Sequence, residues 1–241
     1  MSDFFKFEDE GVDFPFYNGI PKLSMAEWVI LALAPFLVGL ITLTGGRCIP
    51  FVELLPRGTL PICYFLVTVI PVDYVCHVKL DLIFRKPRLK DFKVIIICFI
   101  LYLVWSIVGN FIATSLGFSP DPNAMTESAV SILDVVFTLI QLVGEELFKV
   151  SVLLIGMGLI YYFTKNRKNA LVFGTFVCMM LFGLIHLTAY NNNLFQCLFY
   201  IGLASIIHLF PYLKTKNVVN SYIVHIMIDL TITAMMLLIP H

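Results

Sequence analysis

The chain has 241 residues, of which 59% are hydrophobic and only 13% are charged. This composition is far more apolar than that of soluble domains, and it predicts an integral membrane protein. Sixteen basic and sixteen acidic residues balance to zero, which excludes the basic surface that nucleic-acid binding requires.

Residues 1–25 are predicted to form a short extramembrane leader. The segment is acidic and rich in phenylalanine, and it lacks the basic, then apolar, then small-residue order of a cleavable signal peptide. We expect its phenylalanines to lie at the membrane interface. Its acidic residues are Asp3, Glu8, Asp9, Glu10 and Asp13.

Seven later segments are long and apolar enough to cross a bilayer, which takes about 20 residues as a helix. The sequence therefore predicts an all-α polytopic membrane protein, with accessory helices in residues 26–124 and a catalytic membrane core in residues 125–241. The seven segments are 28–43, 59–75, 94–113, one within 131–163, 170–187, 194–213 and 218–239.

Basic residues alternate between the two sides of these predicted helices. The leader and the loops 77–93, 165–168 and 214–217 hold 13 of the 16 Lys and Arg residues. The intervening loops hold only Arg47 and Arg57, and Lys149 lies within a span. The positive-inside rule then predicts a cytoplasmic N-terminus.

The six cysteines are scattered singly and form no CxxC pair. The spacing favours neither a zinc knuckle nor a disulfide framework, and we expect small buried hydrophobic side chains.

Two adjacent carboxylates, Glu145 and Glu146, interrupt the fourth apolar segment. Burying a single carboxylate at membrane depth costs at least about 2.5 kcal/mol, so retaining two suggests a function. At 100° per residue, Asp134, Glu145 and Lys149 share one helix face, and Glu146 points about 100° away.

Two later segments carry histidines at helical spacing. His186 follows Phe182 by four residues, and His225 precedes Asp229 by four. An aspartate one turn away can accept the imidazole N–H and set its tautomer. We expect His77 and His241 to be solvated, and we expect His208, a lone membrane histidine, to be a hydrogen-bonded packing residue outside the site.

Structural explanations exist for each of these groups. Lys149 could simply neutralise Glu145, and His225 with Asp229 could lock two helices together by hydrogen bonds. The coincidence of three such groups on three of the last four helices favours a functional site.

The ordered motifs resemble those of the CAAX protease and bacteriocin-processing (CPBP, or Abi) family of intramembrane proteases. Glu145-Glu146, Phe182-x-x-x-His186 and His225-x-x-x-Asp229 correspond to its pattern EExxxR, FxxxH and HxxxN, over about residues 125–240. The resemblance implies an endopeptidase that hydrolyses a membrane-associated peptide or protein.

Two positions depart from the family pattern. Val150 stands where the family has arginine, with Lys149 one residue earlier, and Asp229 replaces the final asparagine. The versions EExxK and HxxxD are similar to those of PrsW-type proteases. These mixed motifs favour a bacterial plasma membrane as the location.

The chemistry of peptide hydrolysis suggests a role for each group. Glu145 is predicted to be the base that activates water, with its properties tuned by Glu146, and His186 to position the water or protonate the leaving nitrogen. His225, oriented by Asp229, is predicted to stabilise the oxyanion. Lys149 would keep one carboxylate ionised in place of the missing arginine.

A metal is left open at this stage. Glu145, His186 and His225 could form the three-ligand set of a catalytic zinc, but the HExxH spacing is absent, and glutamate-activated water without metal is equally compatible. The sequence slightly favours no metal.

Helix arithmetic conflicts with this convergence. Measured from the basic loops, Glu145 and His186 lie roughly 24–27 Å along their helices, whereas His225 lies roughly 10 Å along its own. The groups can meet only if the last helix starts deeper, if helices tilt or if a boundary is wrong.

Two other classes of function remain. One is a non-catalytic membrane scaffold or bacteriocin-immunity protein of the same fold, with a sensor kinase or a peptide exporter as its partner. The other is a proton-coupled transporter, which the lack of internal repeats disfavours.

Overall fold

The computed structural model describes residues 3–56, 58–77, 79–118, 121 and 131–238. Within them the fold is all-helical, and seven helices are long and apolar enough to span a membrane, which confirms the predicted fold class. The seven long helices are α1 (Met25–Leu43), α2 (Thr59–Cys76), α3 (Asp91–Ser115), α4 (Ile132–Thr164), α5 (Arg167–Leu184), the π-helix η6 (Gln196–Leu203) continuing into α6 (Ser205–Thr215), and α7 (Val218–Leu238).

Some predictions fall outside these residues. The expected boundary between residues 124 and 125, the end of the last span at residue 239, and His241 all lie outside the described residues.

Four short 3-10 helices accompany the long ones. One lies in the leader, η1 (Asp3–Phe5), and three lie between long helices: η2 (Val52–Leu54), η3 (Leu80–Leu82) and η5 (Leu187–Tyr190).

Polar side chains cap the starts of three long helices, α1, α4 and α5. Ser24 and Glu27 form a capping box at the start of α1, and Ser131 and Asp134 form another at the start of α4. In each box the serine oxygen accepts from a backbone N–H that has no partner within the helix. Asn166 caps α5 in the same way, which keeps the turn between α4 and α5 short.

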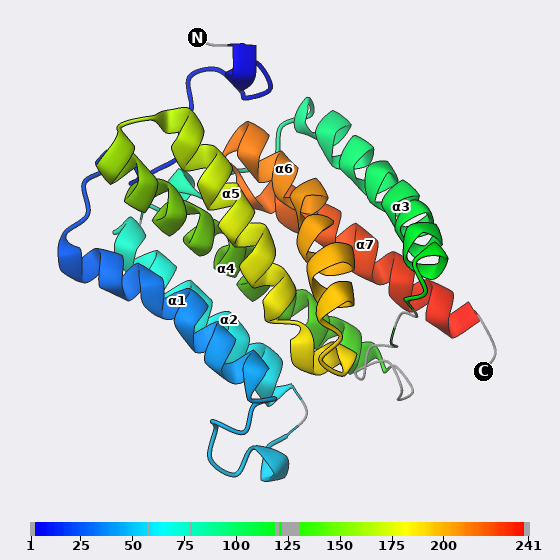
Figure 1. The fold of residues 1–241 in the computed structure, drawn as a ribbon. Coiled ribbons are helices and arrows are strands. Elements are labelled where there is room, and N and C mark those ends of the chain that lie inside the picture. Colours follow the sequence, from blue (N-terminus) through cyan, green and yellow to red (C-terminus); the bar gives the residue numbers. More distant parts are fainter. Residues whose placement is uncertain (1–2, 57, 78, 119–120, 122–130, 239–241) are drawn as a thin grey trace.

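Helix α4 lies at the centre of the bundle, packed against α1, α2, α5 and α7 (Figure 1). Helix α3 lies to one side, against α6 and α7. The middle of α4, from Gly144 to Met157, is almost continuously buried, so polar groups on it are held away from lipid as well as from water.

Glycines allow α4 to approach its neighbours closely. A Cβ on Gly144 would stand 2.7 Å from Cδ1 of Tyr64 and 3.0 Å from the Tyr64 carbonyl oxygen on α2. A Cβ on Gly156 would stand 3.0 Å from the Cα of Gly174 on α5. Small residues at such crossings are the usual means of close helix packing in membranes.

The N-terminal leader is folded onto the basic end of the bundle. Glu8 accepts a bidentate pair from Arg167, at 2.9 and 2.7 Å, and bonds Lys216 Nζ at 2.5 Å. Asp9 contacts Arg88, with Lys90 at 3.2 Å and Lys214 at 3.3 Å. The acidic leader thus neutralises the basic loops.

Two of the leader's phenylalanines are buried in the bundle, and the expected place of the leader at the membrane interface stays a prediction. Phe14 and Phe16 are only 1% and 2% exposed and belong to the main core. Phe14 lies beside Tyr212 of α6, with ring centroids 5.9 Å apart, because the leader covers the end of α6.

This cover explains how the last helix reaches the site. Lys216 and Asn217, at the start of α7, are buried, and the Asn217 side chain bonds the backbone N–H and carbonyl of Arg85 at 2.9 and 2.8 Å. Helix α7 therefore begins below the loop and the leader. A deeper start of the last helix, one of the three explanations for the conflict in heights, agrees with this cover.

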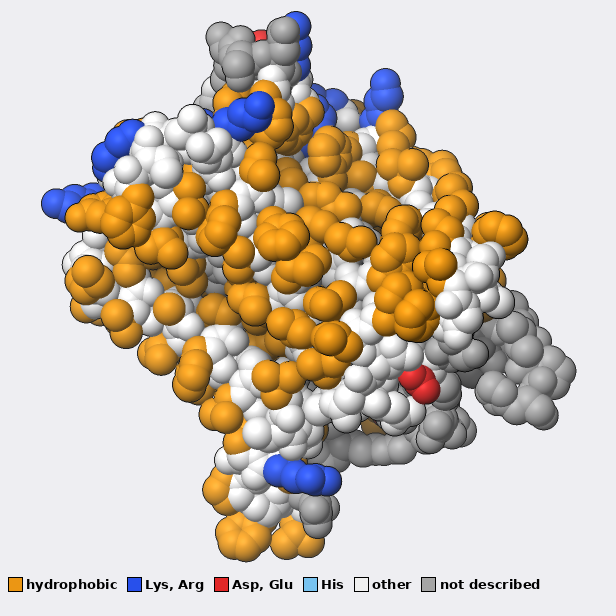
Figure 2. Space-filling model, in the orientation of Figure 1, with side chains coloured by type: hydrophobic (Ala, Val, Ile, Leu, Met, Phe, Trp, Pro, Cys, Tyr) orange, Lys and Arg blue, Asp and Glu red, His pale blue; other side chains and the backbone are white. Residues whose placement is uncertain are grey.

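The surface separates charge from apolar side chains. Lys and Arg gather at the end where the leader lies, above a broad hydrophobic band (Figure 2). Such a band is what contact with lipid tails requires.

All six cysteines are free, as predicted, and four are buried; Cys48 is exposed, contrary to expectation.

Gly144→Ala should destabilise the bundle by about 1–3 kcal/mol, because the added methyl group meets α2 backbone and cannot be relieved by a rotamer change. The measurement is thermal unfolding of the purified protein in detergent. Gly39→Ala is the matched control, because its Cβ would meet nothing within 4 Å. Equal unfolding midpoints for the two variants would contradict the tight crossing.

Contact between the leader and the bundle should weaken at low pH. Burial alone would raise the pKa of Asp9 and Asp13. Hydrogen bonds from Arg88, Lys90 and Lys214 to Asp9 together outweigh it, as do the hydrogen bonds and charge of Arg167 with the Phe14 N–H and Tyr17 at Asp13, so each pKa is held below its ordinary 3.8. A carboxyl with a lowered folded pKa stabilises the docked state above the ordinary value. That contribution is lost as the pH falls through the folded pKa.

Amide hydrogen exchange in residues 3–17, corrected for intrinsic rate, should therefore accelerate below about pH 4, while α4 stays protected. An Asp9→Asn/Asp13→Asn variant should lose this pH dependence. Protection that persists unchanged to pH 2 would contradict the assigned role of these ion pairs.

Candidate functional site

The ionisable groups predicted from the sequence come together beside the middle of α4. Glu145 and Glu146 are 6% and 1% exposed, and they face different surroundings. Glu146 points into a closed cluster with α6 and α7, whereas Glu145 lines a cavity. This division of two adjacent carboxylates underlies the geometry of the site.

Glu146 is paired with a fully buried lysine. Lys149 Nζ lies 2.5 Å from Glu146 Oε1 and 2.6 Å from His208 Nδ1. Because an ammonium only donates, Nδ1 of His208 accepts here. The ammonium also lies 4.7 Å from the ring centroid of Phe182. The shared helix face of Lys149 and Glu145 predicted an ion pair between them, and this prediction is wrong. Lys149 pairs instead with Glu146, three residues earlier in the chain.

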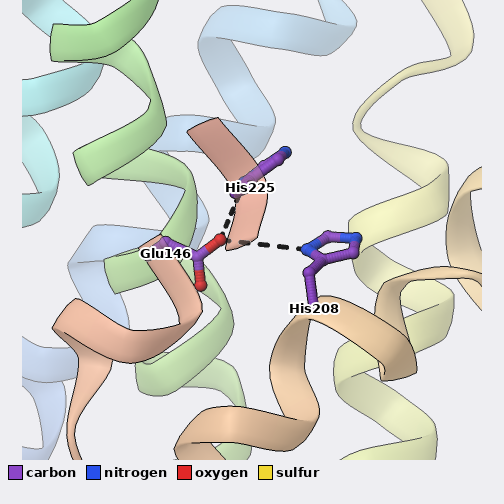
Figure 3. A group of neighbouring side chains, drawn as sticks. All are labelled: Glu146, His208 and His225. Carbon is purple, nitrogen blue, oxygen red and sulfur yellow. Dashed lines mark hydrogen bonds and ion pairs between the residues drawn. The ribbon is translucent and has the colours of Figure 1, made fainter. Parts of the chain in front are cut away.

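His225 lies against the same carboxylate. Its Nδ1 is 2.7 Å from Glu146 Oε1, and Figure 3 shows His225 and His208 both approaching the same oxygen of Glu146. Since a carboxylate only accepts, Nδ1 carries the proton. The other ring nitrogen, Nε2, points to Glu145 Oε2 at 3.8 Å and Asp229 Oδ1 at 3.9 Å.

Asp229 was expected to orient His225, but at 3.9 Å it makes no hydrogen bond to the ring. Glu146, at 2.7 Å, holds the imidazole instead. Asp229 lines the cavity and is about one-third exposed, so it faces any bound molecule.

Glu145 is held by one hydrogen bond and has histidines nearby. Gln141 Nε2 donates to its Oε1 at 2.8 Å, and His186 Nε2 lies 4.0 Å from its Oε2. His186 Nδ1 lies 2.7 Å from the carbonyl of Phe182, so Nδ1 is the donor and the neutral ring leaves Nε2 free to accept. A separation of 4.0 Å suits a bridging water better than a direct bond.

These groups open into a cavity of about 470 Å³. Glu145, His186, His225 and Asp229 line it together with Asp134, which agrees with the predicted shared face of Asp134 and Glu145. Phe182 lies between the histidine rings, 4.8 Å from His186 and 6.1 Å from His225 between centroids. It packs the site and offers no reactive group.

Three residues of this cluster were not predicted from the sequence: His208, Gln141 and Tyr64. His208 was assigned to packing, yet it contacts Lys149 and lies 4.6 Å from His225 between ring centroids. A usable signal exists: His208 lies eight residues before Lys216 and His225 nine after it, which places both at one height in the α6–α7 hairpin. Gln141 and Tyr64 gave no signal. The Tyr64 hydroxyl is buried, and the described residues provide it with no hydrogen-bond partner.

One group of side chains has a composition that could hold a metal, namely Glu146, His208 and His225, with one atom of each within 4.8 Å of the others. Only His225 belongs to the set predicted from the sequence. The Lys149 ammonium already shares Glu146 Oε1 and His208 Nδ1. A metal would have to displace this buried cation, so the arrangement does not fit a resident ion.

Residues 127–231 match the family described as Type II CAAX prenyl endopeptidase Rce1-like. This match confirms the resemblance predicted from the motifs, and it supports a CAAX-type intramembrane endopeptidase in general. A search of curated proteins and a search of solved structures each found no match.

Lys149→Met should be strongly destabilising, by about 3–5 kcal/mol, because it leaves the Glu146 carboxylate buried without its counter-charge. Removing both charges in Lys149→Met/Glu146→Gln should restore much of the loss. The measurement is thermal unfolding in detergent, with Lys86→Met in an exposed loop as control. The single variant Glu146→Gln is measured as well. If the double variant loses as much stability as Lys149→Met and Glu146→Gln lose in sum, the two groups are not coupled.

Proposed function

We propose that this chain is an intramembrane endopeptidase in which Glu145 activates a water molecule that attacks a peptide bond. The observation that carries the proposal is the separation of the two carboxylates. Glu146 is bound by Lys149 and His225, whereas Glu145 faces the cavity with a free oxygen. The family match supports the class of reaction.

The first step uses the space between Glu145 and His186. A water held between Oε2 of Glu145 and Nε2 of His186 would give one proton to Glu145 as its oxygen bonds the scissile carbonyl carbon. His186 accepts the second hydrogen bond of that water, because its own proton lies on Nδ1, toward Phe182. The imidazole thus orients the water.

His225 is proposed to stabilise the oxyanion. Glu146 accepts from Nδ1, and two carboxylates, Glu145 and Asp229, lie near Nε2. A ring between acidic groups on both sides can carry two protons, and its Nε2–H then points into the cavity as a donor. When the C–N bond breaks, the proton on Glu145 passes to the leaving nitrogen.

The location is also proposed in finer detail. The seven apolar helices and the family match indicate an integral membrane protein. We place the leader and the basic loops in the cytoplasm, because the basic residues of the chain gather there. A bacterial plasma membrane, and a sensor kinase or a peptide exporter as partner, stay predictions.

Glu145→Gln should lower peptide cleavage by about 10²–10⁴-fold, because the amide keeps the shape and the bond to Gln141 but cannot accept a proton. The assay is mass spectrometry of a peptide library incubated with the purified protein in lipid nanodiscs. Glu27→Gln, at a carboxylate on α1 outside the cavity, is the control and should retain activity.

Full turnover by a folded Glu145→Gln variant would refute the base assignment. Unchanged cellular function in Glu145→Gln, His186→Ala and His225→Ala variants alike would favour the non-catalytic scaffold instead. Abundance of each variant must be measured in parallel, because His225 also contacts Glu146 in the core.

A further inference from the structure

The cavity is confined to one end of the bundle. Neighbouring helices run in opposite directions, yet the residues that line it always belong to the same end of the molecule. On α1 the lining begins at Ile41, near the last residue, and on α2 it ends at Tyr64, near the first. On α4 it covers Asp134 to Glu145, in the first half, and on α7 it covers His225 to Thr233, toward the end.

The turns that join these helices extend the cavity further. Gly45 and Gly46, just after α1, and Thr188 to Tyr190, just after α5, also line it. These turns lie at the end of the bundle opposite the leader (Figure 1). The cavity therefore reaches from the level of Glu145 to that face.

The opposite end carries the basic residues. The loops 79–93, 165–168 and 214–216 and the leader all lie there, whereas the described part of the turn after α1, on the cavity side, contains Arg47. Such an asymmetry orients membrane proteins with the basic loops in the cytoplasm. The mouth of the cavity is then on the outer side.

The charge of the cavity limits what enters it. Three carboxylates, those of Asp134, Glu145 and Asp229, line the walls, and the described lining residues include no Lys or Arg. A free C-terminal carboxylate would meet three like charges at short range, with no Lys or Arg among the described lining residues to pair with it, at a cost that rises as water is excluded. An internal bond in an uncharged or basic stretch avoids this cost.

We infer that the site takes its substrate from the extracytoplasmic face, and that the substrate is an internal peptide segment without negative charge around the scissile bond. The inference rests on the proposed function and names the substrate class for the same site. A volume of about 470 Å³ is within the usual range of ligand pockets, so a short extended segment fits and a folded domain does not.

Cysteine labelling tests the side of access without any need for catalysis. Ala189 lines the cavity near its mouth, and the exposed native cysteine is removed by Cys48→Ser. In that background, Ala189→Cys should react with a membrane-impermeant maleimide in intact cells. Lys86→Cys, in an exposed basic loop, should react only after permeabilisation. Cys48→Ser alone gives the background signal.

The same labelling reports the charge preference. A ten-residue peptide flanked by lysines should slow the reaction of Ala189→Cys at least twofold, and the same peptide flanked by glutamates should not. Reaction of Ala189→Cys only after permeabilisation, or from neither side, would overturn the side of access. Equal or stronger protection by the acidic peptide would overturn the substrate class. Glu145→Gln tests the reaction separately, so the two failures are distinguishable.

Discussion

The shared ammonium of Lys149 is the interaction on which the site depends. A charge removed from both water and lipid is tolerated only with partners, and Lys149 has Glu146 at 2.5 Å and His208 at 2.6 Å. Through them it joins α4 to α6, and Glu146 in turn holds His225 on α7. Three helices are thereby positioned around a single cation.

This cluster lets two neighbouring carboxylates differ. Glu146 is bound to a cation and an imidazole, while Glu145, turned about 100° away on the same helix, faces the cavity with Gln141 as its donor. His186, in the turn after α5, and His225, on α7, flank the open carboxylate. The leader contributes at a distance, because its Glu8 bonds Lys216 beside the buried start of α7.

Much of the architecture follows from local patterns in the sequence. Runs of about 20 apolar residues are enough to predict seven spans, and the ordered motifs with their family resemblance are enough to select His186 and His225 as site residues. Pairing across helices was harder. The positions of the residues around the helix predicted an ion pair of Lys149 with Glu145 at i−4. The lysine pairs with Glu146 instead, because a long side chain can reach i−3 as well as i−4. His208 was missed, since only the hairpin between α6 and α7 brings it beside His225.

The most direct test of the account is peptide cleavage by the Lys149→Met/Glu146→Gln variant, compared with Glu145→Gln under the same conditions. If Glu146 and Lys149 act by positioning His225 and His208, the double variant should retain measurable cleavage, reduced by about 10–100-fold as for other groups that orient a functional histidine. Glu145→Gln should retain far less. Cleavage that survives in Glu145→Gln but disappears in a well-folded double variant would show that Glu146 is the base and would contradict the account.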